Sequence, residues 1–131
     1  MSSSGGVASF HRNLAFVFLF LAAVVQFFLA GLGAFGAESY DAHQGMGSLL
    51  SLISLVLLVL AFVGRREAVP ASVALFVLMI IQTVLGVAGE DVGVLGGLHP
   101  VNGLLVLFAA HQAARGLPLP IGGGGARAPR V

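Results

Sequence analysis

The chain has 131 residues, of which 58% are hydrophobic and only 8% are charged. Its mean hydropathy is +1.05, and a water-soluble domain of this length could not cover so much apolar surface with so few polar side chains. The net charge of +1 argues against a nucleic-acid partner. Cysteine is absent, which excludes disulfides and thiolate-ligated clusters. The composition therefore predicts an integral membrane protein whose main partner is the lipid bilayer.

Four apolar stretches follow one another along the chain, over residues 14–35, 45–64, 71–88 and 98–114. Each matches the roughly 17 to 25 residues that a membrane-spanning helix needs. The expected fold is therefore all-α, a four-helix antiparallel transmembrane bundle over residues 11–116. We expect a disordered N-terminus over residues 1–10 and a disordered Pro- and Gly-rich tail over residues 117–131.

The chain contains an internal repeat. Gln26 and His43 are followed 56 positions later by Gln82 and His99, with the same 17-residue interval in both cases. The same offset also aligns four further identical pairs, Leu29/Leu85, Gly33/Gly89, Gly47/Gly103 and Leu49/Leu105. The bundle is therefore predicted to consist of two repeated helical hairpins. Repeated hairpins in a membrane bundle imply a pseudo-twofold axis, which brings a repeated side chain toward its counterpart.

The repeated histidines are the leading candidates for a cofactor site, because histidine is the commonest metal ligand among side chains. Each is expected in or beside the first turn of its helix. Asp41 is the expected N-cap of the second span, and Pro100 is expected in the first turn of the fourth, where proline costs no hydrogen bond.

Glycine follows each histidine four residues later, at Gly47 and Gly103, on the same helix face. The missing side chain leaves room beside the imidazole for a flat ligand or a close backbone. This pattern favours axial ligation of a haem iron by His43 and His99. Gln26 and Gln82 are candidates for contact with the haem edge, or for hydrogen bonds between helices.

Two other interpretations of the histidines stay open. A zinc site needs three or four ligands, and the nearby carboxylates are Glu38, Asp41, Glu90 and Asp91, of which only the first two have the i, i+3 spacing that converges on a helix. Alternatively, the histidines are polar contacts between helices in a cofactor-free structural or accessory subunit.

At these residues the chain resembles known families. The order of glutamine, small residues, loop, histidine and glycine in each hairpin resembles one four-helix half of haem A synthase over roughly residues 24–114. The resemblance implies that His43 and His99 are the axial pair of a haem. Two positions depart from that family: its glutamate three residues before the histidine is Tyr40 here, and its following arginine is Gln44. Without that glutamate, haem hydroxylation is not implied.

The Gln, AGLG, DAH and HPVN signatures also resemble a family of small, uncharacterised four-helix bacterial membrane proteins, which implies the fold and the bacterial cytoplasmic membrane but no activity. In addition, the order of His11, His43, His99 and His111 is similar to that in di-haem b-561-type cytochromes, including superoxide oxidase. That similarity implies a second haem held by His11 and His111. Against it, neither residue has a histidine as its counterpart in the repeat.

The expected function is that of a b-type haem-binding protein with bis-histidine ligation, carrying one haem or two, and serving in electron transfer. Two filled axial positions leave no place for dioxygen or substrate, so catalysis is not expected. Haem transport or handling is the other haem-based alternative. A redox partner, a larger membrane complex or a homo-oligomer would each suit such a protein.

The arginines predict the orientation in the membrane. Arg12 precedes the first span, Arg65 and Arg66 follow the second, and the other three, Arg115, Arg127 and Arg130, follow the fourth. The remaining two loops carry no basic residue. By the positive-inside rule, both termini are expected to be cytoplasmic.

This orientation can be tested with topology reporters. A reporter fused after Arg130 should read as cytoplasmic, and one inserted at Gly36 or Gly93 should read as external, because basic loops are retained inside. An external location of the loop that contains Arg65 and Arg66 would contradict the four-span topology.

Overall fold

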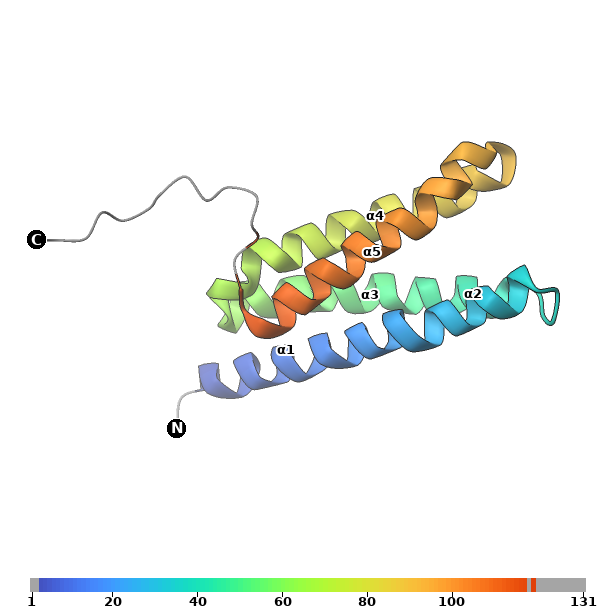
Figure 1. The fold of residues 1–131 in the computed structure, drawn as a ribbon. Helices are drawn as coiled ribbons and strands as arrows, with labels where there is room; N and C mark the ends of the chain where they lie inside the picture. Colours follow the sequence, from blue (N-terminus) through green and yellow to red (C-terminus); the bar gives the residue numbers. More distant parts are fainter. Residues whose placement is uncertain (1–2, 118, 120–131) are drawn as a thin grey trace, which may run out of the picture.

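In a computed structural model that describes residues 3–117 and 119, the chain forms an all-α bundle of four helical rods (Figure 1). The first rod is continuous through α1 (Ser3–Phe20), the π-helical turn η1 (Leu21–Val25) and α2 (Gln26–Ala34). The second is α3 (Asp41–Gly64). The third comprises the short 3-10 helix η2 (Arg66–Ala68) and α4 (Val69–Asp91), and the fourth is α5 (Gly93–Arg115). The predicted fold class is confirmed.

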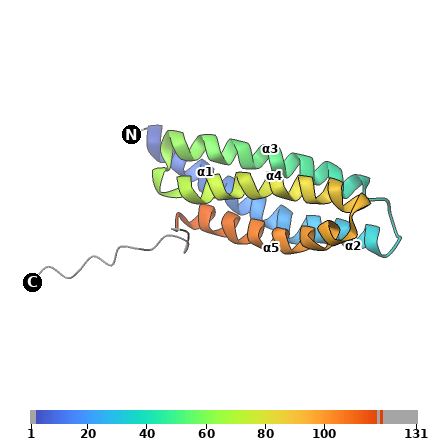
Figure 2. The ribbon, with the colours of Figure 1, turned by 90° about the horizontal axis from the view of Figure 1, so that it is seen from above.

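All four rods have the length and apolar composition of membrane-spanning helices, as expected of an integral membrane protein. Successive rods run in opposite directions, so the start of α1 and the end of α5 lie at the same end of the bundle (Figures 1 and 2). We call this end, which contains Arg65, the closed end. The other end, with the linkers 35–40 and Val92, is called the open end.

The chain termini differ in part from the expectation. Helix α1 already begins at Ser3, so most of the segment 1–10 is helical instead of disordered. The physical reason is tertiary, because His11, Ala15 and Phe18 are buried and fix α1, and an established helix extends backward at little cost. At the other terminus, α5 ends at the left-handed Gly116 (φ 65°). Most of the expected tail, residues 118 and 120–131, lies outside the described residues.

Side chains are packed most tightly toward the closed end. Small residues dominate there, which lets the helix backbones approach one another as in other membrane bundles. The fully buried side chains in this part include Ala15, Phe18, Ser54, Leu57, Ala61, Ala71, Ser72, Leu75, Ala110, Ala113 and Ala114. By contrast, α2 contributes no buried residue at the open end.

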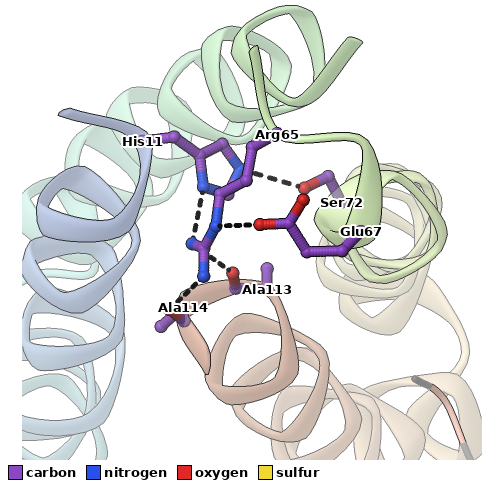
Figure 3. A network of polar contacts seen from close by, with 6 residues as sticks. All are labelled: His11, Arg65, Glu67, Ser72, Ala113 and Ala114. Atoms are coloured by element: carbon purple, nitrogen blue, oxygen red, sulfur yellow. Dashed lines mark hydrogen bonds and ion pairs between the residues drawn. The ribbon is translucent and has the colours of Figure 1, made fainter. Parts of the chain in front are cut away.

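A buried arginine links the helices at the closed end by hydrogen bonds. Arg65 occupies the linker between α3 and η2, and its guanidinium donates to the carbonyl oxygens of Ala113 and Ala114 at 3.0 Å each (Figure 3). These carbonyls belong to the last turn of α5, where carbonyl oxygens have no N–H partner within the helix. This turn also carries the negative end of the helix dipole. Arg65 also pairs with Glu67 at 3.1 Å, but Glu67 is 60% exposed and adds little.

The same guanidinium holds α1. Arg65 Nη1 lies 3.1 Å from His11 Nδ1 and can only donate, so Nδ1 is the acceptor and the ring proton is on Nε2. That proton is donated to Ser72 Oγ on α4, at 3.2 Å. Through Arg65 and His11, the ends of α1, α3, α4 and α5 are joined in one hydrogen-bonded network (Figure 3).

The two hairpins turn differently at the open end. In the second, a Cβ at Gly89 would lie 2.6 Å from Gly96 Cα, so α4 and α5 meet backbone to backbone, and only Val92 links them. In the first, the equivalent Gly33 faces the ring of Tyr40, and six residues, 35–40, form the linker.

This close contact corrects the expected start of the fourth helix. Helix α5 begins at Gly93, so His99 lies beyond its first turn and Pro100 is inside the helix. The reason is the Gly89–Gly96 contact, which stabilises two helical turns that the sequence pattern did not reveal. At the start of α3, Tyr40 is the N-cap residue in place of Asp41, so the helix begins at Asp41, one residue earlier than expected.

Substituting Gly89 should push apart α4 and α5, the two helices of the second hairpin. Gly89→Ala places a methyl group against the backbone of Gly96, which cannot move without shifting α5, and we expect a loss of about 1 to 3 kcal/mol. Gly97→Ala is the matched control, since a Cβ there meets nothing within 4 Å. Thermal unfolding in detergent should show a lower midpoint for Gly89→Ala only, and equal midpoints would contradict the close contact.

The Arg65 network gives a second stability prediction. Arg65→Ala leaves the carbonyls of Ala113 and Ala114 and the buried His11 without their donor, which should cost about 3 kcal/mol. The neighbouring Arg66 is exposed, so Arg66→Ala removes the same charge without these bonds. In the same detergent, the free energy of unfolding should fall for Arg65→Ala and stay nearly unchanged for Arg66→Ala. A similar loss of stability in both variants would show that the charge, and not the hydrogen bonds, matters.

Candidate functional site

The structure brings the two repeated histidines together near the open end. The ring centroids of His43 on α3 and His99 on α5 are 6.0 Å apart, and the ring planes make an angle of 61°. Both side chains are half-buried. The ring of Tyr40 packs edge-on against His43, with a centroid distance of 6.1 Å.

Each imidazole is oriented by the glutamine of its own hairpin. His43 Nδ1 lies 3.2 Å from the backbone oxygen of Gln26, and His99 Nδ1 lies 3.0 Å from that of Gln82. A carbonyl oxygen can only accept, so Nδ1 carries the proton in both rings. The lone pair is therefore on Nε2. This is the second-shell arrangement typical of histidines that bind metals through Nε2.

The glutamine side chains approach the same Nε2 atoms. Gln82 Nε2 lies 3.0 Å from His99 Nε2, whereas Gln26 Nε2 lies 3.5 Å from His43 Nε2. Gln26 Nε2 donates instead to the backbone oxygen of His43 at 3.0 Å. Ligation of a metal by either Nε2 requires the amide to turn away, while the Nδ1 bond to the backbone stays in place.

A cavity of about 700 Å³ contains this histidine pair. Its volume lies within the range of ordinary small-molecule and cofactor sites. It is lined from both hairpins, and Figure 1 shows that these hairpins diverge toward the open end. Besides the histidines and glutamines, its lining includes Tyr40, Gln44, Ser48, Thr83 and Glu90 among mostly apolar side chains.

The repeated glycines leave space for the amide groups of the glutamines. Both Gly47 and Gly103 line the cavity, and a Cβ would lie 3.4 Å from Gln26 Nε2 at Gly47 and 3.6 Å from Gln82 Nε2 at Gly103. The space expected beside the imidazoles is thus occupied by the amides that contact them. Gly86, on α4, gives the clearance for His99 itself, since a Cβ there would meet its Cε1 at 3.3 Å.

The other two histidines lie elsewhere. His11 is fully buried in the Arg65 network, and both of its ring nitrogens have protein partners. His111 lies on α5 and is half-buried. In the described part of the chain, no hydrogen bond or ring contact joins His11 to His111. Ligation of a second haem by His11 would break its contact with Arg65, because iron would either replace Arg65 at Nδ1 or, at Nε2, leave the ring proton on Nδ1.

Asn102 is a site residue that sequence reasoning missed. It is buried, and its Nδ2 donates to Gln82 Oε1 at 2.7 Å and to the backbone oxygen of Leu78 at 3.0 Å. The available signal was its position three residues after His99, on the same helix face, in the HPVN signature. It is not part of the repeat, because the equivalent residue in the first hairpin is Met46.

Residues 26–89 match the model of a family of unknown function, DUF6220. The matched stretch contains Gln26, His43 and Gln82 but ends before His99. No curated protein and no solved structure matches the chain. These comparisons therefore give the resemblance to haem A synthase and to b-561-type cytochromes no support, and they name no cofactor.

Proposed function

We propose that the protein binds one b-type haem in the membrane, with His43 and His99 as its two axial ligands, and that it serves in electron transfer. The observation that carries this proposal is the pair of imidazoles, 6.0 Å apart and each presenting an unprotonated Nε2, within the cavity.

The number of ligands favours haem over a bare metal ion. Zinc needs three or four protein ligands, and no group of three or more His, Cys, Asp or Glu among residues 3–117 and 119 could hold a metal ion. Haem brings four nitrogen ligands of its own, so two histidines complete its coordination. A site with two histidines, a large cavity and no third ligand therefore suits haem.

The spacing of the rings fits the same group. The ring centroids of His43 and His99 are 6.0 Å apart, so both imidazoles could reach one iron once the glutamine amides turn away from Nε2. Bound haem would supply the redox chemistry, and the protein would hold it, orient it and tune its potential.

Electron transfer follows from the ligand set. Two histidines fill both axial positions, which favours cycling between oxidation states over binding of a substrate. By the positive-inside rule, we expect this site near the external face of the bacterial cytoplasmic membrane, with both termini inside. We propose that orientation together with the function. A haem-handling protein would use the same two ligands but would release the haem more easily.

A cofactor-free structural subunit is the competing proposal. It is favoured by the bonds that already join each histidine to the glutamine of its own hairpin, which are typical of polar contacts between membrane helices. It leaves the cavity beside both Nε2 atoms without an explanation.

The absorbance spectrum of the purified full-length protein tests these proposals. We expect one low-spin haem per chain in protein from cells supplied with haem. The double variant His43→Ala, His99→Ala should lose it, because no axial ligand remains. His111→Ala is the control and should retain at least one haem.

The alternatives give different results in the same experiment. A colourless wild-type protein would favour the structural subunit. A full low-spin spectrum in the double variant would show that the ligands lie elsewhere, and a ratio of two haems per chain would point to a second site.

A further inference from the structure

The two Nε2 atoms that would bind iron differ in how firmly a protein group already occupies them. On His99, the side-chain amide of Gln82 contacts Nε2 at 3.0 Å, well within the usual range of hydrogen-bond lengths. On His43, the amide of Gln26 lies 3.5 Å from Nε2, at the outer limit of such a bond. The lone pair of His43 is therefore nearly free, whereas that of His99 is in use.

A second hydrogen bond keeps Gln82 in its place against His99. Asn102 on α5 donates from Nδ2 to Gln82 Oε1 at 2.7 Å, and the same Nδ2 donates to the backbone oxygen of Leu78 on α4 at 3.0 Å. Turning the Gln82 amide away from His99 breaks its contact with Nε2 and also its bond from Asn102. Two hydrogen bonds must therefore be lost before His99 can bind a metal.

The first hairpin carries a weaker constraint. Met46 stands where the second hairpin has Asn102, and methionine has no N–H or O–H group to donate. Gln26 Oε1 is buried and, within the part of the chain that the structure describes, has no hydrogen-bond partner to lose. Freeing His43 Nε2 thus disturbs at most one hydrogen bond of normal length, which joins Gln26 Nε2 to the backbone oxygen of His43 at 3.0 Å.

We propose that His43 is the first axial ligand of the haem and His99 the second, because the Gln82 amide competes with iron for His99 Nε2. Asn102 is the positioning residue that holds Gln82 in this competing position. The inference rests on the function proposed above and adds an order of ligation to it. Until the Gln82 amide turns away, only one of the two histidines is available.

The block on His99 can be measured without haem. Diethyl pyrocarbonate acylates an unprotonated imidazole nitrogen, so its rate of reaction with each histidine of the haem-free protein in detergent reports whether Nε2 is free. Gln82→Leu removes the competing amide but keeps the backbone oxygen that orients the ring. It should raise the rate at His99 about fivefold or more, the effect of losing one hydrogen bond.

Gln26→Leu is the matched control on the other histidine. It removes only a contact at the limiting distance of 3.5 Å from His43 Nε2, so the rate at His43 should change by less than about twofold. An unchanged rate at His99 in Gln82→Leu would overturn the proposal. An equal acceleration at the two histidines in their respective variants would overturn it as well.

The role of Asn102 needs its own pair of variants. Asn102→Ala releases the Gln82 amide and should raise the rate at His99 about twofold or more, whereas Met46→Ala, at the equivalent position, should leave His43 unchanged. If Asn102→Ala lowers the unfolding temperature without changing the rate at His99, Asn102 is only structural and its positioning role is overturned. Should Asn102→Ala fail to fold, Gln82→Leu still decides whether His99 is blocked.

The order of ligation is tested by mixing the haem-free protein with haem in a stopped-flow spectrometer. The wild-type protein should show a high-spin spectrum, from ligation by one histidine, before the low-spin spectrum of two. Gln82→Leu should speed the second phase about fivefold or more and leave the first unchanged. His99→Ala should stop at the high-spin stage, and His43→Ala should slow the first phase.

The outcomes separate this proposal from the proposed function. A low-spin spectrum that forms in one phase, or a first phase that depends on His99 instead of His43, would overturn the order of ligation and leave haem binding intact. A protein that takes up no haem would overturn the proposed function and the order together. The reactivity of the haem-free protein would then still decide whether Gln82 blocks His99.

Discussion

The packing of the whole bundle depends on how Arg65 is accommodated. A guanidinium withdrawn from water is costly unless its N–H groups donate to other acceptors, and those of Arg65 donate to the last carbonyls of α5 and to His11 of α1. Those partners come from opposite ends of the chain. Satisfying one charge therefore brings the first and last helices together, and the small residues next to it pack closely as a result.

The two hairpins can diverge at the open end because they are held together at the closed end. The tight packing of alanine and serine ends before the histidine pair, and a cavity of about 700 Å³ lies between the hairpins instead. The two histidines there find their partners locally, in each case across 17 residues within a single hairpin. Each hairpin therefore orients its own histidine, and the bundle decides only how close the two imidazoles come.

Much of the fold was contained in the pattern of apolar residues. The four spans and their alternation follow from hydropathy, because a bilayer imposes a minimum length that a sequence shows directly. The helix ends were less predictable. The early start of α5 depends on two glycines, Gly89 and Gly96, whose contact is invisible until the helices are placed, and the ordered start of α1 depends on the burial of His11.

The sequence by itself determined the two glutamine–histidine pairs and their pseudo-symmetric placement, since a repeat of 56 residues is a property of the order of residues alone. Only the tertiary structure decided the ring nitrogen that stays unprotonated, the use of Gly47 and Gly103 to admit amide groups, and the inequality of the halves. The reason is that these depend on distances between helices. One asparagine in place of a methionine changes a hydrogen-bond network only where a neighbouring helix offers Gln82 and the backbone of Leu78.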